Sequence, residues 1–237
     1  MFKYSDIFLD YYAFIYSDWI GPDITNFEID LIESLLNNGG KILDVGAGSG
    51  RHFKSLGGSK YILNALENDI RCIQYLINKS IADEIISQDV NSFAIKNQSN
   101  YDLVTLFFNT FCEVALTYQS GLDLIKNLFI NLVDQNGYVL MCITDTDDQL
   151  PVIGDSFNFQ KRNDSFIFDV DYKLTEIDEP EKIVTTEDSV RIIDLKTEAV
   201  LSEIYRINRK KWWKSSEIMS IANENKPSIV FMKSFIF

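Results

Sequence analysis

Residues that build metal sites and disulfide frameworks are scarce in this sequence. Among its 237 residues there are three cysteines and a single histidine. Cys72, Cys112 and Cys142 stand far apart in apolar stretches, so we expect reduced, buried thiols and not a disulfide framework. No two of them have the spacing of a zinc site, and one histidine leaves little with which to complete one. We therefore expect no bound metal ion.

Long uncharged apolar runs are also missing. Charged or amide side chains interrupt every hydrophobic segment before it reaches the roughly 20 residues that cross a bilayer. The first residues are apolar, but they include Asp6, Asp10 and Asp18 and have no basic leader, unlike a signal peptide. These absences predict a soluble, cytoplasmic protein that does not act at a membrane.

Positively charged residues are also scarce. Lysine and arginine number 22 against 35 aspartates and glutamates, which gives a net charge of -13. Such a surface repels nucleic-acid phosphates at long range. The basic and aromatic segment RINRKKWWK, residues 206–214, precedes an amphipathic helix, so we expect its apolar parts to cover core and not to stack on bases. The expected partner is a small-molecule substrate and not nucleic acid, and the protein is expected to be a monomer or a homodimer.

The sequence does contain a regular alternation of strand and helix signals up to about residue 143. This alternation predicts an α/β fold with a parallel sheet and helices on both faces. We expect the helix that begins near Asn26 to bury Phe27, and the helix after residue 68 to bury Ile70 and Ile77.

The character of the chain changes after Pro151. Strand-like runs separated by turn signals predict an antiparallel meander over residues 155–208. The sequence therefore divides into an aromatic N-terminal cap at 1–26, an α/β core at 27–150, an antiparallel β insertion at 151–208 that acts as a substrate lid, and a C-terminal helix with the final core strand at 209–237.

A glycine-rich bend, Gly46-Ala47-Gly48-Ser49-Gly50, follows the first core strand, and a helix is expected to open at Arg51 or His52. A dinucleotide site would need a glycine where Arg51 stands. It would also set its pyrophosphate near Asp44, at a cost of about 1 to 4 kcal/mol for charges ~4 Å apart near a surface. S-adenosylmethionine has the complementary layout, because its carboxylate suits the loop N–H groups while its ammonium and sulfonium suit Asp44.

Two more acids stand at the ends of the next two predicted strands. Glu67 ends the second strand, where a carboxylate can accept both ribose hydroxyls, as it would in a NAD site as well. Asp89 ends the third strand, where it can take the adenine amino group while Val90 offers a backbone N–H to the ring. Any one acid at such a place is commonly a helix cap, but three at successive strand ends beside a glycine loop form a specific constellation.

On these residues the chain resembles the class I S-adenosylmethionine-dependent methyltransferases. The resemblance covers about residues 27–143 and is carried by ILDVGAGSGR (42–51), LE (66–67), QDV (88–90), YDLVTLFFNTF (101–111) and NGYVLMC (136–142). It implies a Rossmann-like seven-stranded, mostly parallel sheet whose last strand is antiparallel. It also implies S-adenosylmethionine as cofactor, with S-adenosylhomocysteine as product. The cofactor-binding residues would be Asp44, Gly46, Ala47, Gly48, Gly50, Arg51, Glu67, Asn68, Asp89, Val90 and Phe107.

Looser matches point to the small-molecule branch of that superfamily. The segment YSDIFLDYYAFIY (4–16) resembles the aromatic cap of glycine-type and amino-sugar N-methyltransferases, and the insertion with YRINRKKWWKSSEI (205–218) resembles theirs. The implied catalytic candidates are Asn109, His52 and Tyr16, and the implied substrate contacts are Tyr12, Trp19, Tyr205 and Arg206. We favour packing beneath the cofactor as the role of His52. An amine that arrives neutral needs no strong base, so methylation of an amine nitrogen is favoured.

Three alternatives stay open at this point. The acceptor could be a hydroxyl of a small natural product. The protein could bind S-adenosylmethionine without catalysis. It could also be a NAD-dependent oxidoreductase, which Asp44 and the glycine spacing disfavour.

Overall fold

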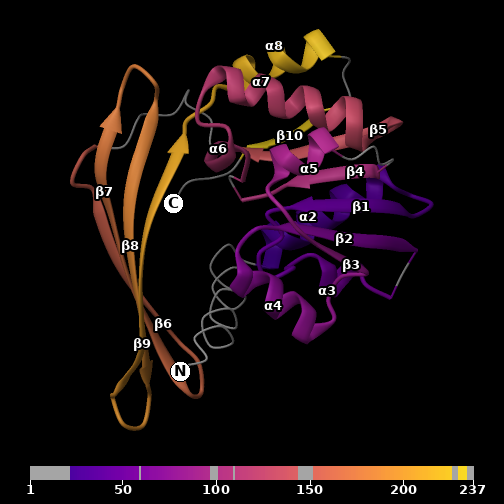
Figure 1. The fold of residues 1–237 in the computed structure, drawn as a ribbon. Helices are drawn as coiled ribbons and strands as arrows, with labels where there is room; N and C mark the ends of the chain where they lie inside the picture. Colours follow the sequence, from indigo (N-terminus) through magenta and orange to yellow (C-terminus); the bar gives the residue numbers. More distant parts are fainter. Residues whose placement is uncertain are drawn as a thin grey trace.

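The computed structural model describes residues 22–58, 60–96, 101–108, 110–143, 152–225 and 229–233. These residues form two sheets, which lie side by side in Figure 1. One has six strands in the order β10-β5-β4-β1-β2-β3, and the other has four in the order β6-β7-β8-β9.

The six-stranded sheet is the α/β core that the sequence predicts. Its strands are β1 (Gly40–Val45), β2 (Tyr61–Glu67), β3 (Glu84–Ser87), β4 (Tyr101–Leu106), β5 (Val133–Ile143) and β10 (Ile229–Lys233). Every pair of neighbouring strands is parallel. Strands β1 and β4 are buried on both faces, as parallel strands covered by helices must be.

Helices cover both faces of this sheet. Side chains of α2 (Pro22–Leu35), α3 (Phe53–Leu56) and α4 (Ile70–Lys79) pack on one face. On the other face lie α5 (Val90–Lys96), α6 (Thr110–Val114), α7 (Tyr118–Asn127) with the π-helical turn Leu128–Leu132, and α8 (Ser215–Asn225). The arrangement confirms the predicted α/β class.

The predicted antiparallel last strand is wrong for the described residues. The sheet has six described strands, and β10 pairs with β5 in parallel. The physical reason is the connection, because the chain returns to the sheet through α8, and a helical crossover brings the next strand back in the same direction.

Two predicted helix stripes are rotated in the structure. Phe27 is 58% exposed, whereas Ile32 and Leu36 are buried in the core. Likewise Ile70 and Ile77 lie on the exposed side of α4. Both helices turn a neighbouring stripe inward, which the apolar residues alone did not distinguish because they cover more than one face.

The second sheet is the predicted meander. Its strands β6 (Ser156–Arg162), β7 (Phe166–Asp178), β8 (Ile183–Asp194) and β9 (Val200–Lys211) pair antiparallel in chain order. One face packs on the core, where Tyr75 of α4 contacts Val190 and Ile192 of β8 in an apolar cluster. We call this the inner face, and the opposite one the outer face.

A tryptophan joins the two sheets where β9 leads into α8. Trp213 is fully buried, and its Nε1–H donates to the backbone oxygen of Ala115 at 3.0 Å. A Cβ at Gly121 of α7 would lie 2.6 Å from its ring, so a glycine is needed there. Trp212 is buried as well. Neither tryptophan of the basic segment is therefore available to stack on a base.

The cysteines are all free thiols, as predicted. Cys112 and Cys142 are buried. Cys72 is half-buried, and burial raises the pKa of its thiol to about 12, so it stays protonated at neutral pH. Within the described ranges, no group of ligand-type side chains is arranged to hold a metal ion, and no helix is long and apolar enough to span a bilayer.

Candidate functional site

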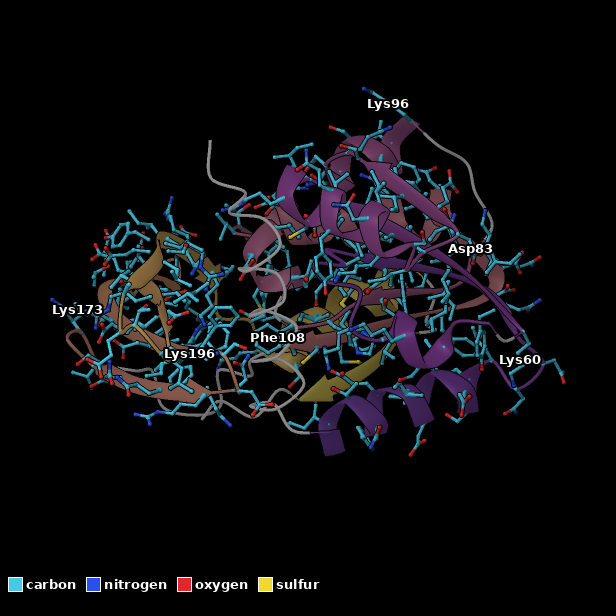
Figure 2. All side chains as sticks on the ribbon, turned by 90° about the horizontal axis from the view of Figure 1, so that it is seen from below. Lys60, Asp83, Lys96, Phe108, Lys173 and Lys196 are labelled. Carbon is cyan, nitrogen blue, oxygen red and sulfur yellow. The ribbon has the colours of Figure 1, made fainter. Side chains whose placement is uncertain are left out.

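The site lies at the edge of the parallel sheet that faces the antiparallel sheet. Figure 2 shows Phe108, which follows β4, between the two sheets, whereas Lys60 and Asp83, which precede β2 and β3, lie at the opposite edge. The edge beside Phe108 is therefore the one at which β1, β2 and β4 end. In open α/β sheets this carboxyl edge is where ligands bind.

Phe108 marks this edge by its backbone. Its φ of 52° lies in the left-handed region, which a bulky side chain rarely adopts, and its side chain is partly exposed. Such strain costs about 1 to 3 kcal/mol and gathers at functional sites. The sequence did not indicate this conformation, because residues in the left-handed region are usually glycine or asparagine.

The glycine bend folds as its composition predicts. Gly46, Gly48 and Gly50 have φ values of 70°, 56° and 66°, all in the left-handed region. A Cβ at Gly46 would lie 2.8 Å from two side-chain atoms of Thr110, so α6 begins in direct contact with the bend. The following helix begins at Phe53 and not at Arg51 or His52, and it spans only Phe53–Leu56. So short a helix has little dipole. Within the bend, the Gly46, Gly48 and Gly50 N–H groups donate to Leu66 O, Glu67 Oε2 and Ala47 O.

Glu67 ties the glycine bend to the start of α4. Its Oε2 accepts a hydrogen bond from the Gly48 N–H at 2.9 Å, and its Oε1 accepts from the N–H groups of Asn68 and Asp69 at 2.8 and 2.9 Å. The carboxylate is buried. Asp69 then caps α4 by accepting from the Arg71 N–H at 2.8 Å. Glu67 therefore holds the bend in place from below.

Asp44 is the carboxylate on which the choice of cofactor depends. It is 4% exposed, and its Oδ1 accepts a hydrogen bond from Thr105 Oγ1 on β4 at 2.7 Å. Burial raises the pKa of Asp44, and the neighbouring His52 and Arg51 only partly offset this effect. A carboxylate in this state gains from a cation placed near it.

Arg51 and His52 are both bound to a residue that the sequence did not single out. Glu28 of α2 is buried, and its Oε2 accepts from Arg51 Nη1 at 2.5 Å and lies 2.7 Å from His52 Nε2. Arg51 also donates to Thr25 Oγ1 at 2.9 Å. The His52 ring lies against Phe107, with 4.2 Å between ring centroids. These contacts give both residues a structural role beneath the bend.

The charge state of Glu28 follows from these partners. Burial acts to raise the pKa of its carboxyl, but the hydrogen bond to His52 and the charge of Arg51 outweigh burial and lower the pKa. The sequence held one signal for this residue. Glu28 stands four residues before Ile32 and eight before Leu36, so it is an acid on the buried stripe of its helix.

Asp89 and Val90 stand at the start of α5. Asp89 is exposed, and its Oδ1 accepts from the Ser92 N–H at 3.0 Å, which is a helix-capping contact. Val90 is buried and begins the helix. Asn68 is exposed beside Glu67. The structure thus leaves Asp89 and Asn68 accessible at the carboxyl edge.

Tyr205 and Arg206 were both expected to contact substrate, and the structure places them on opposite faces of the antiparallel sheet. Successive residues of a strand point to opposite faces, so only one of the two can face the core. Arg206 lies opposite Asp188 on the inner face, whereas Tyr205 is 59% exposed on the outer face. Four other candidates, Asn109, Tyr12, Tyr16 and Trp19, lie outside the described residues.

The described residues fit S-adenosylmethionine at this edge. The buried Asp44 carboxylate suits a cation, and the positive-φ glycines, which have no side chain, let a ligand approach the backbone of the bend. Glu67 stands at the end of the neighbouring strand, where a carboxylate suits ribose hydroxyls. Together with the fold, these features define the class: a class I S-adenosylmethionine-dependent methyltransferase.

Several solved structures are similar in fold to this chain, and two of the three that follow are named as methyltransferases. The structure of DesVI from Streptomyces venezuelae has a TM-score of 0.70 at 13% identity, covering 85% of this chain and 81% of that chain. A S-adenosylmethionine-dependent methyltransferase from Clostridium acetobutylicum has a TM-score of 0.69 at 15% identity, covering 91% and 86%. CalS10, an amino pentose methyltransferase from Micromonospora echinaspora solved with S-adenosylmethionine, has a TM-score of 0.67 at 13% identity, covering 95% and 90%.

The family is given by the sequence itself. A family model described as "Tellurite resistance protein TehB" matches residues 22–201, so the chain belongs to the TehB family. No curated protein matches the sequence significantly.

Proposed function

We propose that the protein transfers a methyl group from S-adenosylmethionine to the nitrogen of a small amine. The observation that carries the choice of nitrogen is the place of His52. This histidine is buried and bound to Glu28 beneath the glycine bend, so it is not placed to take a proton from a hydroxyl. An ammonium ion is acidic enough to lose its proton to a carboxylate, whereas a hydroxyl is far less acidic and usually needs a stronger base.

The cofactor would be held by the residues of the carboxyl edge. Asp44 would face its cationic groups, the glycine bend would lie against its methionine moiety, and Glu67 would face its ribose. Asp89 and Val90 would take the adenine. When bound, S-adenosylmethionine supplies a methyl carbon already activated by the sulfonium. The task of the chain is then to align the acceptor and keep water out.

The neighbouring structures give independent support for an amine acceptor. KedS8 from Streptoalloteichus is titled a sugar N-methyltransferase, with a TM-score of 0.66 at 11% identity, covering 85% of this chain and 77% of that chain. CalS10 is titled an amino pentose methyltransferase. We propose further that the antiparallel sheet is the substrate lid, because its inner face lies against the core at α4 and α6.

Calorimetric titration and methyl transfer together test this function. We expect the protein to bind S-adenosylmethionine and S-adenosylhomocysteine and not NAD. With a radiolabelled methyl donor we expect label on amines, and not on matched alcohols, phenols or tellurite, the oxyanion for which the family is named. Tighter binding of NAD would overturn the cofactor. Label on alcohols or phenols alone would make the protein an O-methyltransferase, and binding without any label would leave a cofactor-binding protein.

A further inference from the structure

The inner face of the antiparallel sheet is apolar at both ends and polar in the middle. Toward one end of β8, Val190 and Ile192 join the apolar cluster with Tyr75. Toward the other end, Val184 packs with Leu174 and Trp212. The residues between, on the same face of β7, β8 and β9, are polar: Tyr172, Thr186, Asp188, Arg206 and Asn208. A buried polar patch between two apolar clusters destabilises the fold unless something satisfies it.

Asp188 is the centre of this polar patch. It is 7% exposed, and its Oδ2 accepts from Arg206 at 2.9 Å and from Asn208 at 2.7 Å. Its other oxygen, Oδ1, is buried and has no hydrogen-bond donor within the described part of the chain. Oδ2 is therefore hydrogen-bonded within the sheet, whereas none of the described residues donates a hydrogen bond to Oδ1.

A second carboxylate faces the polar patch from the core. Glu113 lies on α6, which packs against β9, as Figure 1 shows at the edge of the parallel sheet. It stands one helical turn after Thr110, the residue that contacts Gly46 of the bend, so both lie on the same side of α6. Glu113 therefore lies between the glycine bend, where the methyl donor would bind, and the antiparallel sheet.

The charges around Glu113 come from both sheets. Its side chain is exposed, and desolvation by the surrounding protein raises the pKa of its carboxyl. Lys210 and Arg206 act in the opposite direction, while Asp188 and Glu67 add to the rise. The charge of Glu67, beside the glycine bend, and the charge of Asp188, in the polar patch, therefore both act on the Glu113 carboxyl.

We propose that Glu113 and Asp188 together bind the methyl acceptor, and that the acceptor is an amine with a second hydrogen-bond donor, such as an amino alcohol. This inference rests on the proposed function. Glu113 binds the acceptor nitrogen next to the glycine bend. The free Oδ1 of Asp188 accepts from the hydroxyl of the same molecule, which satisfies the buried oxygen.

The proton of the acceptor follows from this placement. An amine arrives as an ammonium ion, which has no lone pair to react. One N–H bond breaks, its proton moves to a carboxylate oxygen of Glu113, and the bonding pair stays on nitrogen as the lone pair. The raised pKa of Glu113 makes this carboxylate a better proton acceptor than an ordinary one. The proton then leaves Glu113 for solvent, which the open side of the group permits.

The probes are trans-2-aminocyclohexanol and cyclohexylamine, which differ only in the hydroxyl. With S-adenosylmethionine, we expect the wild type to methylate the amino alcohol with a KM roughly tenfold lower. In Asp188→Asn the amide oxygen stays with Arg206 and Asn208, so the amide nitrogen replaces the free oxygen and an acceptor becomes a donor. This variant should lose the tenfold preference between the two probes.

Glu113→Gln should slow the methylation of both probes, with kcat falling roughly tenfold or more. The matched control is Glu187→Gln, because Glu187 neighbours Asp188 in β8 but lies on the outer face. We expect this control to leave KM and kcat unchanged for both probes. Titration of each variant with S-adenosylhomocysteine should give wild-type affinity, which shows that the variants fold. Titration of both probes into the S-adenosylhomocysteine complex should reproduce the preference as binding.

The outcomes separate the two proposals. If the wild type methylates both amines but Asp188→Asn keeps the preference, the acceptor site is wrong and the proposed function stands. If Glu113→Gln leaves both probes unchanged, the role of Glu113 is wrong. If label appears on alcohols alone or on no probe, the proposed function fails and this inference fails with it.

Discussion

The two sheets of this protein place their polar groups in different ways. In the parallel sheet, strands β1 and β4 are mostly apolar and buried, and the carboxylates Asp44 and Glu67 stand where strands end. In the antiparallel sheet the polar groups that face the core stand in mid-strand. The parallel sheet is buried on both faces, so its edge is where chemistry can be reached. The meander is covered on one face only, so the alternation of its side chains decides what faces the core.

The two sites also differ in how their acids are held. Asp44 and Glu67 accept from a threonine and from backbone N–H groups, so the fold itself holds them. Asp188 accepts from Arg206 and Asn208, which are side chains on the neighbouring strand. The donor site is therefore bound to the backbone of the bend. Asp188 depends instead on two side chains of β9.

The largest expected effect comes from removing the support beneath the parallel edge. Glu28→Gln breaks a buried group of charges and should lower the free energy of unfolding by about 3 kcal/mol in guanidinium denaturation. The lowered pKa of Glu28 contributes stability above the ordinary carboxyl pKa that is lost as pH falls through the lowered value. The variant should therefore lose stability at neutral pH and show a weaker acid dependence. Glu33→Gln, on the exposed side of the same helix, is the control, and an equal loss there would contradict the buried role.

The next effect compares the two edges of the parallel sheet. Glu67→Ala removes a carboxylate that holds the bend, and the affinity for S-adenosylhomocysteine should fall roughly 50-fold in calorimetry. Asp102→Asn is matched to it, because Asp102 also accepts a backbone N–H, from Lys41 at 2.7 Å, but at the opposite edge. Asp102→Asn should leave the affinity unchanged. Similar losses in both variants would mean that the effect is one of folding and not of the site.

A smaller effect tests the cation that Asp44 is proposed to face. Asp44→Asn should weaken S-adenosylmethionine binding roughly tenfold, and S-adenosylhomocysteine less, because only the former carries the sulfonium. The raised pKa of Asp44 has the opposite sign from that of Glu28. Its ionisation lowers stability as pH rises above the ordinary carboxyl pKa. The variant should therefore melt a few degrees higher at neutral pH. A lower melting temperature with unchanged binding would refute the assignment.

The smallest effect sharpens the contrast between the two faces of the meander. Tyr205→Ala should leave KM and kcat unchanged, because this side chain lies on the outer face. Arg206→Ala should raise KM for the amine, because Asp188 would lose one of its two partners. Steady-state kinetics measure both. If Tyr205→Ala proved the more damaging of the two, the outer face would have to be part of the site.

Much of the donor site could be predicted from local pattern. The bend from Gly46 to Gly50 and the acids Asp44 and Glu67 are set by spacing along single strands, and the structure places them as predicted. Glu28 could not be found in the same way, because its partners Arg51 and His52 come from another segment. The parallel direction of β10 depends on the path of the chain through α8, which no local pattern encodes.

The sequence by itself determined the alternation of strands and helices, the glycine bend and the acids at the strand ends, because each depends on residues only a few positions apart. The tertiary structure decided which charges meet. It paired Glu28 with His52 and turned Arg206 and not Tyr205 toward the core. Such contacts join segments far apart in the chain, and their geometry is fixed only when the tertiary structure forms.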